Sequence, residues 1–198
     1  MKKQEYESYQ AYVDWQKSKI DKPGVVENLT KVRARRIKEF RNLFREFSFG
    51  SLHAKALCLG ARLGEEVEAL SLLGFDAIGV DLNEYPPLVI AGDFNKTLPF
   101  SDHSFSLIFS NSVDHVYDLQ AWSKEIRRLL LPRGQLFLWL MLGFMGNYES
   151  IQIDKPEEIT DLFPDFNILV NKPISWKVYN HALLLEKSDQ KSEQHSAV

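Results

Sequence analysis

The sequence lacks disulfide-forming cysteines and long apolar runs. Its one cysteine, Cys58, cannot form a disulfide within the chain, so we expect a reducing, cytoplasmic setting. No apolar stretch reaches the ~20 residues needed to cross a bilayer. The N-terminal residues are polar, without the hydrophobic segment of a signal peptide. The sequence therefore predicts no membrane association.

An excess of charge of one sign is also missing. The 24 basic and 27 acidic side chains give a net charge of −3, so the chain as a whole has no electrostatic attraction to nucleic acid or anionic lipid. At 198 residues the chain is long enough for one domain with at most a small appendage.

Several catalytic motifs are absent. His53, His103 and His181 are isolated in the sequence, and no group of histidine, cysteine and carboxylate residues has metal-ligand spacing, so we predict no metal site. The chain has no Gly-x-Ser-x-Gly turn, which argues against a serine hydrolase of the α/β type. It also has no phosphate-binding loop of the Walker type.

What is present is a β-α-β pattern over residues 56–82. An apolar run ends in a glycine-bearing turn, a helix-length segment 65–74 follows, and a second apolar run closes on Asp81. Gly60 allows a sharp backbone turn. Gly64 lets the helix start close to the sheet, so that its first amides face a ligand. Asp81 lies where a carboxylate accepts hydrogen bonds from ribose hydroxyls, so the pattern predicts a nucleotide-like cofactor.

The rest of the chain continues the alternation of strands and helices. The apolar periodicity predicts strands at 52–59, 76–80, 88–91, 105–109 and 135–142, and helices at 63–73, 119–131 and 156–162. Residues 95–102 read as a loop, so the usual second crossover helix is short or absent. Residues 167–170 and 176–186 predict a closing strand pair.

This pattern predicts an α/β fold: a doubly wound, Rossmann-like, mostly parallel sheet with an antiparallel edge hairpin, plus N-terminal helices. We expect three parts: a helical cap over residues 1–49, the main domain over 50–187 and a disordered tail over 188–198.

The N-terminal helices carry two further patterns. One is a strongly basic stretch, 31–45, which reads either as a face for nucleic acid or an acidic partner, or as a solvated face; the slightly acidic chain favours the second. The other is a set of aromatic residues at three-residue steps: Tyr6, Tyr9, Tyr12 and Trp15. We expect these to pack the first helix onto the domain, with a lid over the cofactor as the alternative.

Together these features resemble a class I S-adenosylmethionine-dependent methyltransferase, close to the type 11 methyltransferase domain. The resemblance covers about residues 52–142. Four blocks carry it in the right order: 56–64; Gly79-Val-Asp81-Leu; Gly92-Asp-Phe94 with Leu98-Pro-Phe100; and 107–115 followed by 125–134. The segment 50–187 would then be the methyltransferase domain.

The resemblance implies S-adenosylmethionine as cofactor and assigns its contacts. Asp81 would hold the ribose hydroxyls, and Asp93 would accept from the adenine amino group. The other implied contacts are Gly60, Ala61 and Gly64 on the methionine and ribose, Leu82 and Phe94 by the adenine, and Ser110, Asn111 and Ser112 near the sulfonium.

Two positions depart from the family pattern. Cys58 stands where the family usually has an acidic residue that helps to hold the amino group of the cofactor, so this contact is lost or comes from another residue. We expect Cys58 to be a small buried residue rather than a nucleophile. Arg62 replaces the middle glycine; it either meets the cofactor carboxylate or points to solvent.

Asp114 and His115 are the candidate catalytic residues. They directly follow the fourth strand, where His115 could accept a proton from the methyl acceptor and Asp114 could orient its ring. Alternatively, Asp114 caps the helix starting near Leu119, His115 is a loop residue and no base is needed, because alignment of the reactants suffices. The loop 143–148 is a natural lid and substrate wall.

We therefore expect methyl transfer to an oxygen or nitrogen of a small molecule that enters between the N-terminal helices and the loop at Gly143. Alternatives are a catalytically inactive cofactor-binding partner subunit and a nicotinamide-dependent oxidoreductase, which the incomplete Gly-x-Gly-x-x-Gly pattern disfavours. Methylation of RNA through the basic helix is a minor alternative. A homodimer is compatible with the sequence.

Overall fold

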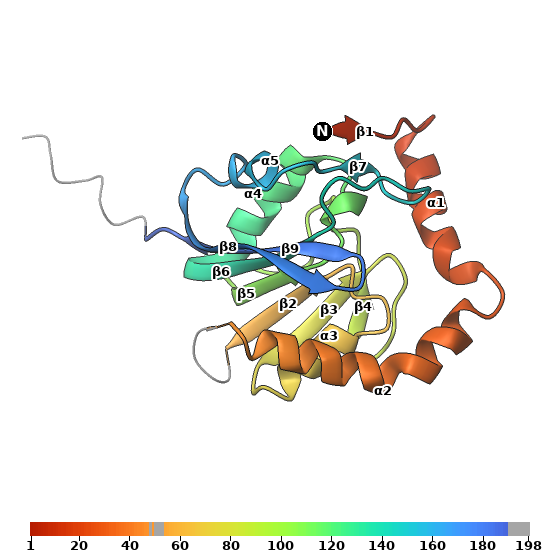
Figure 1. The fold of residues 1–198 in the computed structure, drawn as a ribbon, viewed down its shortest axis with the longest axis horizontal. Helices are drawn as coiled ribbons and strands as arrows, with labels where there is room; N and C mark the ends of the chain where they lie inside the picture. Colours follow the sequence, from red (N-terminus) through yellow and green to blue (C-terminus); the bar gives the residue numbers. More distant parts are fainter. Residues whose placement is uncertain (48, 50–53, 190–198) are drawn as a thin grey trace, which may run out of the picture.

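The fold is built on one mixed sheet of seven strands. The computed structural model describes residues 1–47, 49 and 54–189, so His53 and most of the predicted tail, 190–198, lie outside the described residues. The strand order is β4-β3-β2-β5-β6-β9-β8. The bounds are β2 Lys55–Leu59, β3 Asp76–Asp81, β4 Val89–Ala91, β5 Phe105–Ser110, β6 Leu130–Leu140, β8 Phe166–Trp176 and β9 Tyr179–Lys187 (Figure 1).

The first five strands in this order are parallel, as predicted. Leu57 of β2 pairs with Ile78 of β3 on one side and with Ile108 of β5 on the other. Strands covered on both faces are apolar throughout, and β2 and β5 are buried along almost their whole length. The predicted α/β, Rossmann-like sheet is confirmed.

The antiparallel edge is also confirmed, with its outer strand, β8, longer than expected. β9 pairs antiparallel with both β6 and β8, and the two strands of this hairpin are joined at Lys177, which has a left-handed φ of 55°. The prediction of 167–170 was too short because the outer face of edge strand β8 is open to solvent. Polar residues on this face, such as Asn171 and Lys172, interrupt the apolar pattern by which the strand could be recognised in the sequence.

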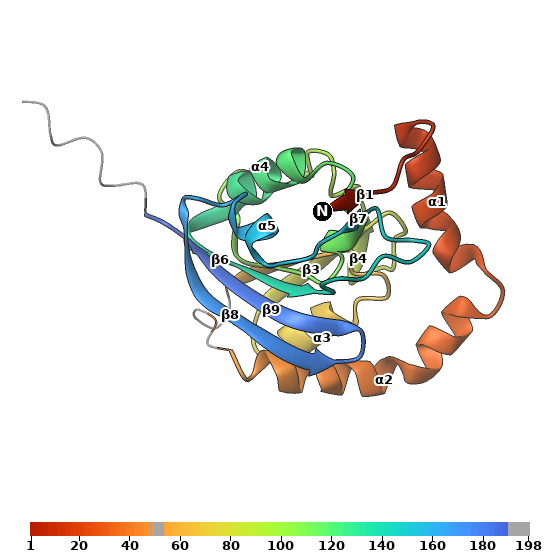
Figure 2. The same ribbon diagram turned by 45° about the horizontal axis from the view of Figure 1, so that its top comes forward.

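Helices cover both faces of the sheet. α4 (Leu119–Leu129) and the short α5 (Glu157–Thr160) lie on one face, and α2 (Val25–Phe44) and α3 (Glu65–Ser71) lie on the other (Figures 1 and 2). α4 was predicted to reach residue 131, but β6 begins at Leu130 without an intervening turn.

The α2 side of the core is aromatic. Phe40 is fully buried and stacks on Trp139 of β6, with ring centroids 5.4 Å apart and planes 7° from parallel. Two of the basic residues of α2 turn toward the domain: Arg33 pairs with Glu68 at 2.7 Å and Arg36 pairs with Glu65 at 2.8 Å. Part of the basic stretch therefore fastens α2 to α3.

The connections on either side of β4 have no helix, in agreement with the expected short or absent crossover. The chain from 92 to 104 is held instead by polar groups of α4. The Leu98 amide donates to Glu125 at 2.8 Å, and Arg128 donates to the Phe100 carbonyl at 2.7 Å and pairs with Asp102 at 2.7 Å. These bonds fix the loop that follows Asp93 and Phe94, two of the residues predicted to contact the cofactor.

The N-terminal segment crosses the end of the sheet where the parallel strands finish. α1 (Tyr9–Asp21) stands beside this end, and β1 (Lys2–Lys3) pairs antiparallel with β7 (Ile151–Gln152) (Figure 1). Ser8 caps α1 by accepting a hydrogen bond from the Ala11 amide at 3.1 Å. No helix among the described residues has the length and apolar content of a membrane span.

Candidate functional site

A cleft opens at the carboxyl ends of β2, β3 and β5, with α1 on its outer side. Ligands of doubly wound sheets bind at this end, where the strand order reverses. The lining residues come from the N-terminal helices, the glycine loop, the ends of three strands and the β8–β9 hairpin: Tyr12, Gln16, Lys19, Ile20, Val25, Arg36, Gly60, Ala61, Arg62, Glu65, Glu66, Asp81, Leu82, Asn83, Phe94, Asn111, Ser112, His115 and Tyr179.

The glycine loop has a conformation that needs Gly60. Its φ is +74°, and a Cβ atom there would lie 2.5 Å from Ser112 Oγ. The Gly60 amide donates to the Val80 carbonyl at 2.9 Å, which holds the loop against β3. Arg62, at the position of the missing glycine, also has a left-handed φ of 45°.

Asp81 ties the end of β3 to this loop. One carboxylate oxygen accepts from the Arg62 amide at 3.0 Å, and the other accepts from the Asn83 amide at 3.1 Å. The carboxylate thus has a fixed orientation at the cleft wall, with acceptor lone pairs left for a ligand.

Asp93 lies beside the cleft rather than in its lining, and it already has partners. Tyr9 of α1 donates to one carboxylate oxygen at 2.5 Å, and the Asn95 amide donates to the other at 3.0 Å. Tyr9 has its pKa raised by burial and by this acceptor. The aromatic residues of α1 therefore do pack onto the domain: Tyr9 and Tyr12 both contact the Tyr117 ring.

The structure brings together most of the predicted site. Nine predicted residues line the cleft: Gly60, Ala61, Arg62, Asp81, Leu82, Phe94, Asn111, Ser112 and His115. Four others do not: Gly64, Asp93, Ser110 and Asp114. Gly64 precedes the first turn of α3, and Ser110 donates to the Leu59 carbonyl at 3.1 Å, a bond within the sheet.

The cleft lining includes charged residues that no sequence pattern indicated. Glu65 is 1% exposed and pairs with Arg36, whereas Glu66 is 3% exposed and forms no ion pair with any described residue. Burial, reinforced by the charge of Glu65, raises the pKa of Glu66 to about 8. Acidic residues are common in the first turn of any helix, so the sequence carries no distinct signal for them.

Lys19 also lines the cleft and was not predicted either. Its Nζ lies 3.2 Å from Nε2 of His115, whose Nδ1 lies 3.0 Å from the Tyr148 carbonyl. Burial lowers the pKa of Lys19 to about 8, although the carboxylates of Asp114 and Glu149 act against this shift. Burial and the charge of Lys19 lower the pKa of His115 to about 3, so this imidazole is neutral at pH 7.

Asp114 lies behind His115, with Oδ2 3.7 Å from its Nε2. Burial and the charge of Glu149 raise the pKa of Asp114 to about 7. Asp114 does not cap α4: the N-cap is Asp118, which accepts from the Gln120 and Ala121 amides. The side-chain N and O atoms of Asp114, His115 and Glu149 that could bind a metal lie within 4.8 Å of one another. The amine of Lys19 lies beside this cluster, so a cationic side chain of the protein already occupies its surroundings.

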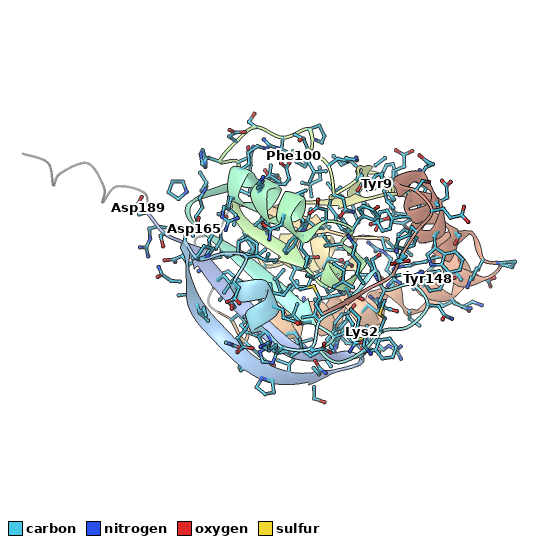
Figure 3. The ribbon with its side chains drawn as sticks, turned by 90° about the horizontal axis from the view of Figure 1, so that it is seen from above. Lys2, Tyr9, Phe100, Tyr148, Asp165 and Asp189 are labelled. Atoms are coloured by element: carbon cyan, nitrogen blue, oxygen red, sulfur yellow. The ribbon has the colours of Figure 1, made fainter. Side chains whose placement is uncertain are left out.

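α1 and the loop 143–150 pack against each other beside His115 and Lys19. Trp15 donates to the Asn147 carbonyl at 3.0 Å, and Gln16 donates to the Tyr148 carbonyl at 2.9 Å. The Trp15 and Tyr148 rings are stacked, with centroids 5.3 Å apart. Figure 3 shows Tyr9 and Tyr148 at the same end of the molecule, far from Asp165 and Asp189.

We expect Tyr9→Phe to lower the free energy of unfolding by about 1–2 kcal/mol, because it removes a hydrogen bond to a carboxylate. Thermal or urea unfolding measures this loss. Tyr6→Phe is the matched control, since Tyr6 bonds only the Ser150 hydroxyl, at 3.0 Å. An equal or smaller loss for Tyr9→Phe would contradict the anchoring role of Asp93.

Comparison with known proteins finds a methyltransferase domain in part of the chain and a similar fold in solved structures. Residues 57–138 match the family model described as a methyltransferase domain. The sequence matches no curated protein. The structure resembles 1,6-didemethyltoxoflavin-N1-methyltransferase of Burkholderia thailandensis, solved with S-adenosylhomocysteine and 1,6-didemethyltoxoflavin bound, with a TM-score of 0.72, 13% identity and coverage of 94% of this chain and 93% of that one.

Two other structures show the breadth of the fold. An S-adenosylmethionine-dependent methyltransferase of Aquifex aeolicus has a TM-score of 0.61 and 16% identity, with 88% of this chain and 98% of that chain covered. The [4+2]-cyclase SpnF has a TM-score of 0.62 and 14% identity, with coverage of 76% and 80%. Residues 57–138 therefore match a methyltransferase domain, and the chain has the fold of these S-adenosylmethionine-dependent methyltransferases.

Proposed function

We propose that the chain transfers the methyl group of S-adenosylmethionine to an oxygen or nitrogen atom of a small molecule. The observation that carries this proposal is the cover formed by α1 and the loop 143–150 over His115 and Lys19. A small acceptor can enter under such a cover, whereas a folded protein or a duplex could not bring a reacting atom to the strand ends.

The cleft residues fit the cofactor. The Asp81 carboxylate is fixed by two backbone amides and faces the cleft, which suits a ribose diol. The glycine loop and Ser112 approach so closely that only glycine fits at position 60, and Gly60, Ala61 and Ser112 all line the cleft. The buried carboxyl of Glu66, also in the cleft lining, offers a further acceptor.

When bound, S-adenosylmethionine supplies an electrophilic methyl group that the acceptor lone pair displaces in line from sulfur. The chain then has to align the acceptor and remove its proton. We propose that Lys19 Nζ, in its neutral form, takes this proton, because Nε2 of His115 already lies within hydrogen-bond distance of Lys19. His115 donates a hydrogen bond from Nδ1 to the Tyr148 carbonyl, and its Nε2 accepts a hydrogen bond from the resulting Lys19 ammonium.

In this proposal His115 and Asp114 keep a role near the reaction but act as positioning residues. The pKa of His115, lowered to about 3, makes it a weak base, while that of Lys19, at about 8, is close to the working range of an enzyme. The Asp114 carboxylate stabilises the ammonium electrostatically.

Calorimetry with S-adenosylmethionine, S-adenosylhomocysteine and NAD tests the cofactor. We expect both adenosyl compounds to bind and NAD not to bind; the reverse result would favour the nicotinamide alternative. Incubation with labelled S-adenosylmethionine and a panel of phenols, N–H heterocycles and carboxylic acids then tests turnover. Binding without turnover on any acceptor would favour an inactive partner subunit.

Asp81→Asn is expected to weaken S-adenosylhomocysteine binding by about 1–3 kcal/mol, because the neutral amide accepts fewer and weaker bonds from the ribose. Asp76→Asn at the exposed start of the same strand is the matched control. Calorimetric titration of both variants gives the comparison. An unchanged dissociation constant for Asp81→Asn would mean that the ribose of the ligand does not bind at the end of β3.

A further inference from the structure

One buried carboxyl in the cleft has no cation to pair with. Glu66, in the first turn of α3, is 3% exposed and lines the cleft. Its neighbour Glu65 is neutralised by Arg36 at 2.8 Å, but Glu66 has no ion-pair partner among residues 1–47, 49 and 54–189. A buried carboxylate is costly unless a cation or hydrogen-bond donors compensate it.

Glu66 also lies beside the position where an acidic residue is missing. Cys58 of β2 is fully buried and is followed two residues later by Gly60, which lines the cleft together with Glu66. The charge of Glu66 adds to burial in raising the pKa of the Cys58 thiol. By the resemblance set out in the sequence analysis, Cys58 stands at a position where an acidic residue is expected to help hold the cofactor amino group. The chain thus has a carboxyl close to that strand position, supplied from the helix that follows.

We propose that Glu66 binds the α-ammonium group of the methionine part of S-adenosylmethionine, in place of the acid that Cys58 replaces. This rests on the proposed function, because it needs the cofactor in this cleft. The ammonium group of the cofactor is a compact cation, and it would enter a site whose buried carboxyl forms no ion pair with a described residue. The ribose of the same ligand would lie at Asp81, on the next strand.

The surroundings of Glu66 define how binding depends on pH. The charged or titratable groups that act on it are Glu65, Arg62, Arg36, Cys58 and Tyr179. Without ligand, Glu66 is mainly protonated at pH 7, since its pKa lies near 8. A bound ammonium favours the ionised form, so binding releases a proton and the affinity rises as the pH approaches about 8.

The decisive experiment compares two ligands and two variants by calorimetry. S-adenosylhomocysteine has the amino acid end, whereas 5′-methylthioadenosine has the adenosine part and no amino group. We expect Glu66→Gln to raise the dissociation constant of S-adenosylhomocysteine about 10- to 100-fold and to leave that of 5′-methylthioadenosine unchanged. Glu68→Gln, on the same helix and paired with Arg33, is the control and should affect neither ligand.

A second measurement needs no variant. Titration of the unmodified protein with S-adenosylhomocysteine, in two buffers of different ionisation enthalpy near pH 7, should show release of close to one proton, and 5′-methylthioadenosine should show none. Asp114 also titrates near pH 7, so Asp114→Asn should retain the proton release and Glu66→Gln should lose it.

The outcomes separate this proposal from the function on which it rests. Unchanged affinity for S-adenosylhomocysteine in Glu66→Gln, or an equal loss for both ligands, would overturn the role of Glu66 and leave the cofactor site in place. If neither ligand binds the unmodified protein, the cleft is not a site for S-adenosylmethionine, and both the proposed function and the role of Glu66 are wrong.

Discussion

Lys19→Met is expected to lower kcat about 10²- to 10⁴-fold, the usual contribution of a positioned proton acceptor. The variant should still bind S-adenosylhomocysteine, because the Lys19 amine contacts His115 and makes no hydrogen bond or ion pair with Asp81 or Glu66. Methionine preserves the length and apolar stem of the side chain and removes only the amine. Release of S-adenosylhomocysteine with the best acceptor of the panel measures the effect.

The pH profile distinguishes a base from a binding cation. A base must be unprotonated, so the rate of the unmodified enzyme should rise with pH and level off above about 8, where Lys19 loses its proton. Lys19→Met should lose this rising limb. A rate that instead falls above this pH would mean that the ammonium form is required, for example to bind an anionic acceptor.

Two control variants isolate the chemistry of the amine. Lys19→Arg retains the positive charge but cannot act as a base at neutral pH, so we expect it to be as slow as Lys19→Met. Lys22→Met removes an exposed lysine one turn further on, which lies 4.7 Å from the centre of the Tyr148 ring, and it should have nearly full activity. Full activity of Lys19→Arg would exclude the role of Lys19 as base.

The sequence predicted the sheet well because local patterns determine it. The apolar runs before Gly60 and Asp81 identify buried parallel strands, and their turns follow from residues within the same segment. The glycine loop and the Asp81 carboxylate were therefore placed correctly in the cleft. Edge strand β8 was shortened because its exposed outer face carries Asn171 and Lys172.

The rest of the site depends on contacts between distant segments. Lys19 and His115 are 96 positions apart, and Tyr9 and Asp93 are 84 apart, so no local spacing reveals either pair. Only the path of α1 across the strand ends brings these side chains together. Glu66 is local to the glycine loop, but a carboxyl in the first turn of a helix is ordinary until its burial and lack of a cation are known.

The Gly60 position is where the cofactor site should be most sensitive to one added methyl group. Gly60→Ala places a Cβ atom at a left-handed φ of +74°, 2.5 Å from Ser112 Oγ and 2.7 Å from Ser112 Cβ. The left-handed conformation costs about 1–2 kcal/mol for a residue with a side chain. Relief of the overlap by moving backbone costs about 1–3 kcal/mol more.

We therefore expect Gly60→Ala to weaken S-adenosylhomocysteine binding by at least about tenfold and to lower the melting temperature. Gly143→Ala is the matched control for strain alone, because Gly143 has a φ of +77° and a Cβ atom added there would meet no other atom within 4 Å. It should lose some stability and bind the cofactor product normally.

A double variant identifies which effect dominates. Ser112→Gly removes the atoms that the new methyl group would strike, so Gly60→Ala with Ser112→Gly should regain the part of the affinity lost to overlap and retain the loss due to strain. If Gly60→Ala binds S-adenosylhomocysteine as tightly as the unmodified protein, the loop between β2 and α3 does not contact the ligand. The carboxylate of Asp81, which is bonded to that loop through the Arg62 amide, would then have to be explained as a purely structural tie.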